Sequence, residues 1–242
     1  MAKPPADTVI DALLERHGQT YAEELGIDVA KGTPSVLFRL LVASILFSAR
    51  IGAGQAVKAA RALADEGWTT AEKLAATSWQ QRVWVLNRHG YARYDERTAS
   101  MLGDACELLV DRYRGDLRRL RAEAGRDPKE ERRLLTEVKG LGEVGVDIFF
   151  REAQVVWEEL FPFVDRRAAQ AARRLGLDAD PRALAGDRNP EAFARLVAAL
   201  VRTGLANDLT RCWRRLGPGR LRDHPHGVPP SLAGCDGSCI AR

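Results

Sequence analysis

Residues 134–147, LLTEVKGLGEVGVD, contain the turn that decides the fold of this chain. Gly140 and Gly142 flank one apolar residue, and apolar segments with helical spacing stand on both sides. Glycine tolerates positive φ and close backbone approach, so the pattern predicts two helices joined by a tight hairpin. The amides of such a turn can bind a phosphate oxygen of a nucleic acid without reading its sequence. An ordinary turn between packed helices has the same pattern, and both interpretations stay open at this point.

The rest of the chain also has the spacing of helices. Apolar residues recur every three or four positions over 9–14, 37–49 and 95–113, and helices are also expected over 144–157 and 190–213. No segment alternates regularly between apolar and polar residues. The segment 37–49 is apolar on most sides, so we expect it to be buried. The sequence therefore predicts an all-α fold.

Composition narrows the class of protein. The chain has 242 residues, of which 45% are hydrophobic, with a net charge of +4. This mild basic excess suits a polyanionic partner without requiring one. The N-terminus lacks the apolar core of a secretory signal, and the longest apolar stretch, 36–47, is too short to cross a bilayer. We expect a soluble, cytoplasmic monomer with no membrane contact.

Asp165 is the candidate catalytic residue. It follows an apolar stretch and precedes a basic segment, 166–174, that is predicted to be a helix. A carboxylate at a helix N-terminus is stabilised by the helix dipole and the free amides, so Asp165 taken alone is a helix cap. Beside a phosphate-binding hairpin it could instead face the sugar of an extruded nucleotide. There it would stabilise the cation that forms as the base leaves, or orient a water.

Four segments, in this order, resemble the helix-hairpin-helix DNA glycosylases and in particular their endonuclease III branch. They are residues 46–50 (LFSAR), residues 88–99 around Gly90, the hairpin, and the pair Val164-Asp165. The resemblance covers residues 9–213 and implies two helical lobes with a DNA-binding cleft, in which a nucleotide is flipped out of the duplex. It places 33–139 in a central lobe, and 1–32 with 140–216, including the second hairpin helix and Asp165, in the other. Residues 217–242 are predicted to form an irregular tail.

The resemblance implies base-excision repair, with hydrolysis of the N-glycosidic bond of a damaged or mispaired base in duplex DNA. Bifunctional members carry a nucleophilic lysine on the second hairpin helix. Val144 occupies that position here, and Lys139 lies on the other side of the turn. We therefore expect a monofunctional glycosylase without AP-lyase activity. A non-catalytic hairpin protein that binds DNA is the alternative, and a helical interaction protein without a DNA role is a third.

The resemblance also indicates which residues contact DNA. Arg50 stands where the family usually has a glutamine that helps to fill the gap left by the flipped base, although a phosphate contact or a surface charge is equally compatible. Tyr94 could stack on a base and Arg93 could contact the orphan partner base. Alternatively, both could belong to a surface turn with a half-buried aromatic ring. The expected DNA-binding set is Gly140, Leu141, Gly142, Gly145, Arg50, Arg93, Tyr94 and Arg166. Four tryptophans are expected in the core: Trp79, Trp84, Trp157 and Trp213.

Cofactor expectations follow from the cysteines. The endonuclease III branch usually holds a 4Fe–4S cluster on four closely spaced cysteines. Here the cysteines are Cys106, Cys212, Cys235 and Cys239, so we expect no cluster, and Cys106 is predicted to be a core thiol. His224, His226, Cys235 and Cys239 have the ligand types of a zinc site, but the glycines and prolines between them are equally typical of a flexible tail. Carbonyls of the hairpin turn could bind a monovalent cation.

Overall fold

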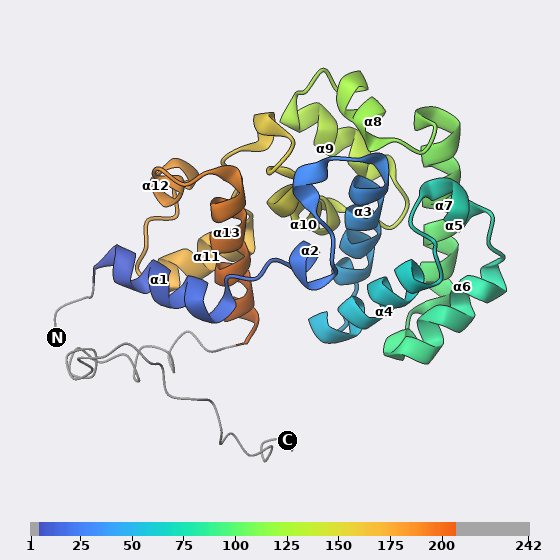
Figure 1. Cartoon of the computed structure of the whole chain (residues 1–242), viewed down its shortest axis with the longest axis horizontal. Helices are drawn as coiled ribbons and strands as arrows, with labels where there is room; N and C mark the ends of the chain where they lie inside the picture. The colour runs from blue at the N-terminus through green and yellow to red at the C-terminus, as the bar shows by residue number, and fades with distance from the viewer. Residues whose placement is uncertain (1–4, 207–242) are drawn as a thin grey trace, which may run out of the picture. The chain divides into compact units, whose positions relative to one another are not determined.

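The computed structural model describes residues 5–206, which form an all-α unit without strands (Figure 1). The predicted fold class is confirmed. The elements in chain order are α1 (Ala6–His17), α2 (Tyr21–Glu24), η1 (Val29–Lys31), α3 (Pro34–Ser48), α4 (Ala53–Asp65), α5 (Ala71–Ala75), α6 (Trp79–Leu86), η2 (Asn87–Tyr91), α7 (Asp95–Tyr113), α8 (Leu117–Glu123), α9 (Pro128–Glu137), α10 (Glu143–Ala153), η3 (Glu158–Leu160), α11 (Arg166–Arg174), α12 (Pro181–Ala185) and α13 (Pro190–Leu205).

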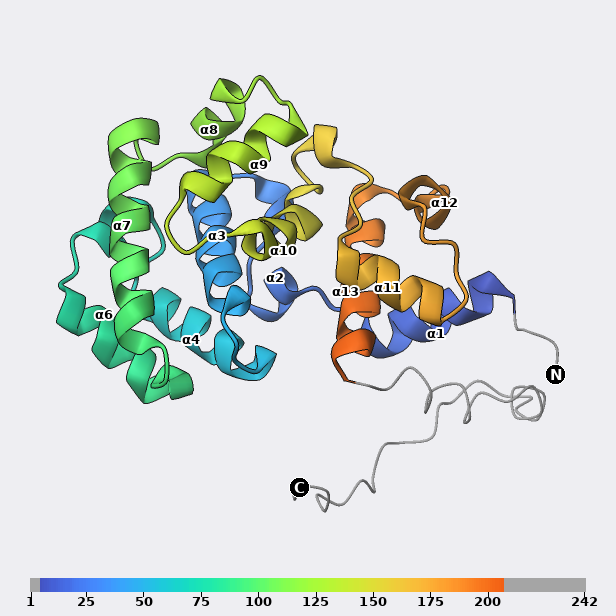
Figure 2. The ribbon, with the colours of Figure 1, turned by 180° about the vertical axis from the view of Figure 1, so that it is seen from behind.

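Helix α3 is the centre of the larger hydrophobic core. Thr33 caps its N-terminus by accepting from the amide of Val36, and Pro34 takes the first position, where a missing N–H costs nothing. Ten of its residues are buried, which confirms the expectation for 37–49. It packs against α4 and against α10, so both helices lie beside it in the two opposite views (Figures 1 and 2). The buried cluster built around α3 extends from Tyr21 to Leu160.

A second group of buried residues lies outside that cluster. Helix α13 packs against α1 and α11, so that the N-terminal helix is next to the last described one (Figure 2). The group includes Val9, Ile10, Ala168, Ala172 and Val197. The lobe boundaries expected from the resemblance stay a prediction, but α10, placed there in the second lobe, packs more extensively against α3 than against α13.

Some expected elements differ from the structure. The helix expected over 144–157 ends at Ala153, because the chain then turns so that Trp157 packs edge-on against Phe149 in the core, with ring centroids 5.3 Å apart. The core placement expected for Trp79 and Trp84 is wrong. Trp84 is 54% exposed with the Arg88 guanidinium 4.5 Å above its ring, and the indole of half-exposed Trp79 donates to the Ser100 hydroxyl. Trp213, the tail 217–242 and the end of the helix predicted over 190–213 lie outside the described residues.

Cys106 is buried in α7, and this burial raises the pKa of its thiol to about 12. The prediction of a core thiol is confirmed, because Cys106 belongs to the buried cluster. The other three cysteines lie outside the described residues, as do His224 and His226. A search of the described helices finds none long and apolar enough to cross a membrane.

Candidate nucleic-acid interface

The predicted hairpin is present between α9 and α10. Gly140 has a φ of +88°, and a Cβ at this position would lie 3.1 Å from Ile45 Cγ2 and from Met101 Cε. Both facts require glycine, because an L side chain is strained at positive φ and the space is filled. The buried side chain of Leu141 points into the core, and its amide donates to the Val138 carbonyl at 3.0 Å. Only the main chain of Leu141 could therefore contact DNA.

The N-terminus of α10 is open. Gly142 is the N-cap residue, with no side chain to accept from the first amides of the helix, and nothing lies within 4 Å of the position a Cβ would take. The first amides of a helix have no partner within it, and together with the helix dipole they attract an anion. Gly145, in contrast, is buried, and a Cβ there would lie 2.9 Å from Leu141 Cδ1. Because Gly145 has no side chain, Leu141 can pack closely against it in the turn.

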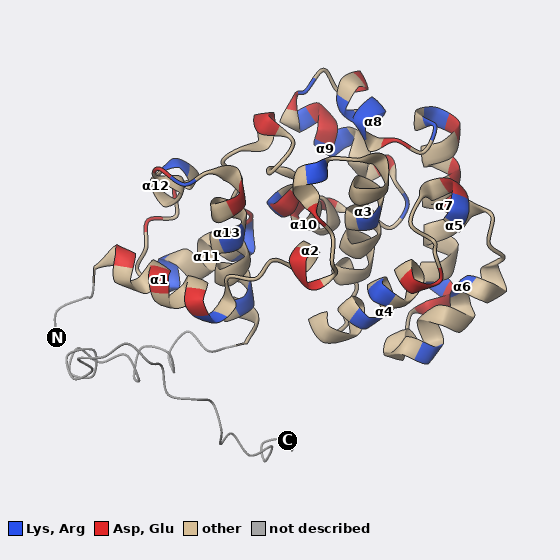
Figure 3. Ribbon diagram, in the orientation of Figure 1, with Lys and Arg blue, Asp and Glu red and all other residues tan. Residues whose placement is uncertain are grey.

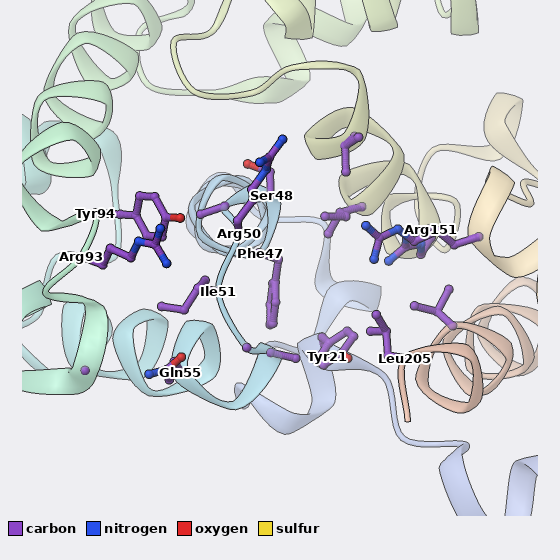
Figure 4. Close-up of a pocket in the computed structure, with 18 residues that line it drawn as sticks. Tyr21, Phe47, Ser48, Arg50, Ile51, Gln55, Arg93, Tyr94, Arg151 and Leu205 are labelled. Carbon is purple, nitrogen blue, oxygen red and sulfur yellow. The ribbon is translucent and has the colours of Figure 1, made fainter. Parts of the chain in front are cut away.

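A pocket of about 500 Å³ lies beside this end of α10 (Figure 4). Four arginines line it: Arg50, Arg93, Arg151 and Arg167. Three aromatic rings contribute, from Tyr21, Phe47 and Tyr94. None of the 18 lining residues, all in the described part of the chain, is acidic. Both signs of charge are mixed along the helices in the view of Figure 3, so the positive charge of the pocket is a local feature.

The pocket has two walls. Figure 4 shows Arg93 and Tyr94 on one side, Arg151 on the other, and Arg50 with Phe47 between them. Tyr94 is half-buried, and the Arg93 guanidinium lies 5.5 Å from the centroid of its ring. The expected half-buried aromatic is confirmed, while contact of Arg93 and Tyr94 with a base stays a prediction.

Tyr21 is held in the pocket by α10. Helix α2 has only four residues, and the Glu152 carboxylate caps it by accepting from the amides of Tyr21 and Ala22 at 3.0 and 2.9 Å. The Tyr21 ring contacts Phe47, with centroids 4.6 Å apart, and the Arg202 guanidinium lies 3.9 Å from its centroid. Because Glu152 and Arg151 are adjacent, one turn of α10 fixes both an aromatic and a cationic part of the pocket.

Asp165 lies behind the pocket wall. Its side chain is buried and does not line the pocket. One carboxylate oxygen accepts from the amides of Arg167 and Ala168, at 2.7 and 3.3 Å, and caps α11. The other oxygen accepts from Nε of Arg151, which does line the pocket. The cap role of Asp165 is confirmed, and a catalytic role stays a prediction.

The structure brings together only part of the predicted set. Arg50, Arg93, Tyr94 and Val144 line the pocket, and Val144 is half exposed there without a group that could act as a nucleophile. Arg166 and Lys139 are exposed but do not line the pocket. The sequence reasoning missed Arg151, although the spacing of Val144, Ile148 and Arg151 places them on one helix face.

No group of three or more side chains within residues 5–206 has the ligand types and proximity of a metal site. The cation expected at the hairpin would be held by main-chain carbonyls. Two of these already accept hydrogen bonds, that of Val138 from the Leu141 amide and that of Gly140 from the Ser48 hydroxyl at 3.5 Å. Because a carbonyl oxygen has two lone pairs, the cation stays a prediction.

Comparison with known proteins adds one structural likeness. The chain is similar to endonuclease III. The matching structure is a trapped covalent intermediate of endonuclease III with DNA, an estranged-adenine complex, at 19% identity and a TM-score of 0.45. The match covers 69% of this chain and 73% of that one. No protein-family model matches the sequence, and no curated protein does.

Proposed function

We propose that this protein binds duplex DNA and accepts, in the pocket beside α10, a nucleotide that has left the base stack. One observation carries the proposal: a pocket lined by four arginines and three aromatic rings adjoins the uncapped N-terminus of α10, and Val144 belongs to both. Main-chain amides and arginines bind phosphates without sequence preference. Aromatic rings stack on any base. Together these groups suit a single nucleotide attached to its backbone.

Binding to a fluorescent duplex at increasing salt tests this proposal. We expect the affinity to fall steeply with salt, with a log–log slope of about −0.9 for each phosphate contacted. Replacing Gly142 by valine places a side chain in front of the first amides of α10, so affinity should fall roughly tenfold, as for the loss of one hydrogen bond to a charged group.

Gly54→Val is the matched control for this variant, since Gly54 is exposed, does not line the pocket and has open space around its Cβ position. It should bind DNA like the parent. Equal binding by Gly142→Val and the parent at low salt would show that the hairpin is not the anchor.

Hydrolytic base removal is a second candidate, favoured by the contact of Arg151 with both Asp165 and the pocket. If Arg151 turned away from Asp165, the carboxylate would be free to stabilise a sugar cation or to orient a water. The chain would then act as a monofunctional DNA glycosylase. With the pair closed, as described, four guanidinium groups oppose a cationic transition state, so the arrangement favours binding without catalysis.

A screen of duplexes with alkylated, oxidised, deaminated and mismatched bases tests the second candidate. Because Val144 cannot form a Schiff base, any product should be an intact abasic strand that breaks only after hot alkali, and borohydride should trap no protein–DNA adduct. A trapped adduct would instead identify an amine nucleophile, with Lys139 the first to replace. If none of these bases is excised while duplex binding is retained, the result supports only the non-catalytic role.

A further inference from the structure

The pocket holds more positive charge than the described protein compensates. Arg50, Arg93 and Arg167 are exposed, whereas Arg151 is 7% exposed. Within residues 5–206 no ion pair is found for Arg50, Arg93 or Arg167, and only Nε of Arg151 is bonded to a carboxylate. Figure 4 shows Arg151 at the wall of the pocket, and within residues 5–206 no hydrogen bond is found for its other two guanidinium nitrogens.

The nearby carboxylates are engaged elsewhere. Glu143 and Asp147 of α10 both accept from Arg132 of α9, at 2.9 and 2.8 Å. Glu152 caps α2, and Asp165 caps α11 while pairing with a single nitrogen of Arg151. The positive charge in the pocket is therefore available to an external anion.

The number and type of these groups indicate which anion fits. An unmodified base is neutral and would leave the arginines uncompensated. An internal phosphodiester brings a single negative charge, whereas a terminal phosphate monoester carries about −1.5 to −2 at pH 7. Guanidinium groups match the phosphate geometry with paired hydrogen bonds. A nucleotide at a strand end also leaves the stack at a lower cost than one inside an intact strand.

We propose that the pocket recognises the phosphorylated end of a DNA strand at a nick or gap. The terminal phosphate would contact Arg151 and the exposed arginines, while Tyr21, Phe47 and Tyr94 provide surfaces for the terminal nucleoside. This inference rests on the proposed duplex binding and specifies the DNA structure that is bound. Both 5′ and 3′ phosphates have the required charge.

Binding to three duplexes with a one-nucleotide gap tests the inference. The first carries a 5′-phosphate at the gap, the second a 3′-phosphate, and the third hydroxyl groups on both sides. We expect one of the phosphorylated duplexes to bind at least about tenfold more tightly than the hydroxylated one, as one added charge-assisted hydrogen bond would give. The better of the two identifies which end is read.

Two substitutions on α11 sharpen the test. Arg167→Gln should abolish most of the preference for phosphate, so that affinity for the phosphorylated gap falls far more than affinity for the intact duplex. Arg174→Gln should keep the preference, because Arg174 is exposed on the same helix and does not line the pocket. A preference below twofold, or one that survives Arg167→Gln, would overturn the inference while duplex binding stands. Failure to bind any duplex would overturn the proposed function itself.

Discussion

Replacing Gly140 by alanine should lower the free energy of unfolding by about 2–5 kcal/mol. The first contribution is backbone strain, since the φ of +88° costs an L residue roughly 1–2 kcal/mol. The second is overpacking, because the new Cβ would lie 3.1 Å from Ile45 Cγ2 and Met101 Cε, and forcing atoms into a packed core costs about 1–3 kcal/mol. Urea denaturation followed by circular dichroism measures the total change in the free energy of unfolding.

Gly142→Ala is the matched control two positions away. Gly142 has a φ of −76° with open space around its Cβ position. The loss of a favourable N-cap residue and the lower entropy of the unfolded chain oppose each other, so the change should stay within about 1 kcal/mol. If Gly140→Ala were as stable as Gly142→Ala, the core around the hairpin would be free to rearrange, and the requirement for glycine would not hold.

The substitution Arg151→Met should destabilise the fold by about 3–5 kcal/mol, because it leaves the buried Asp165 carboxylate without its cationic partner. Asp165→Asn should also destabilise, since the asparagine keeps the cap but leaves Arg151 charged at the edge of the core. The double variant should lose less than the sum of the two single variants, by roughly 0.5–3 kcal/mol of coupling.

The exposed pair Arg133–Glu130 provides the comparison for this cycle. Arg133→Met should leave the midpoint of unfolding essentially unchanged, because water and salt screen such pairs. Wild-type stability in Arg151→Met would mean that water reaches the Asp165 carboxylate, as a catalytic role would require. Any activity measured for Asp165→Asn has to be corrected for the fraction of this variant that denaturation shows to be unfolded.

Elements with local signals at both ends could be predicted from the sequence. The segment 95–113 corresponds to α7, because its apolar positions are periodic. The helix expected after Asp165 is α11, because Asp165 is a cap residue at its start. The hairpin was also predictable, because its two glycines are a local signal. Helices α2 and α12 were missed, because four or five residues give no periodicity, although each has a local cap, Thr20 with Glu23 in α2 and Asp180 in α12.

The pocket was less predictable than the fold, because its residues come from segments far apart in the chain. Arg50 and Tyr94 were identified through motifs. Tyr21 has no local signal that sets it apart from other helical residues, and for Arg151 the signal is its spacing from Val144 on one helix face. The burial of Asp165 was also beyond sequence reasoning. A cap residue is usually exposed. The Asp165 carboxylate is instead buried against Arg151, which lies 14 residues earlier in the chain.

The pairing of α1 with α13 constrains how the chain can be made. The larger core needs residues 21–160, and these can be complete while the ribosome is still synthesising the rest. The buried face of α1 packs against α13, which begins at Pro190, so its apolar side chains stay uncovered while the residues between the two helices are synthesised. Contacts between such distant segments also form slowly, since a long loop has to close first. Helix α1 is therefore among the last of the described helices to pack, although it is synthesised before the others.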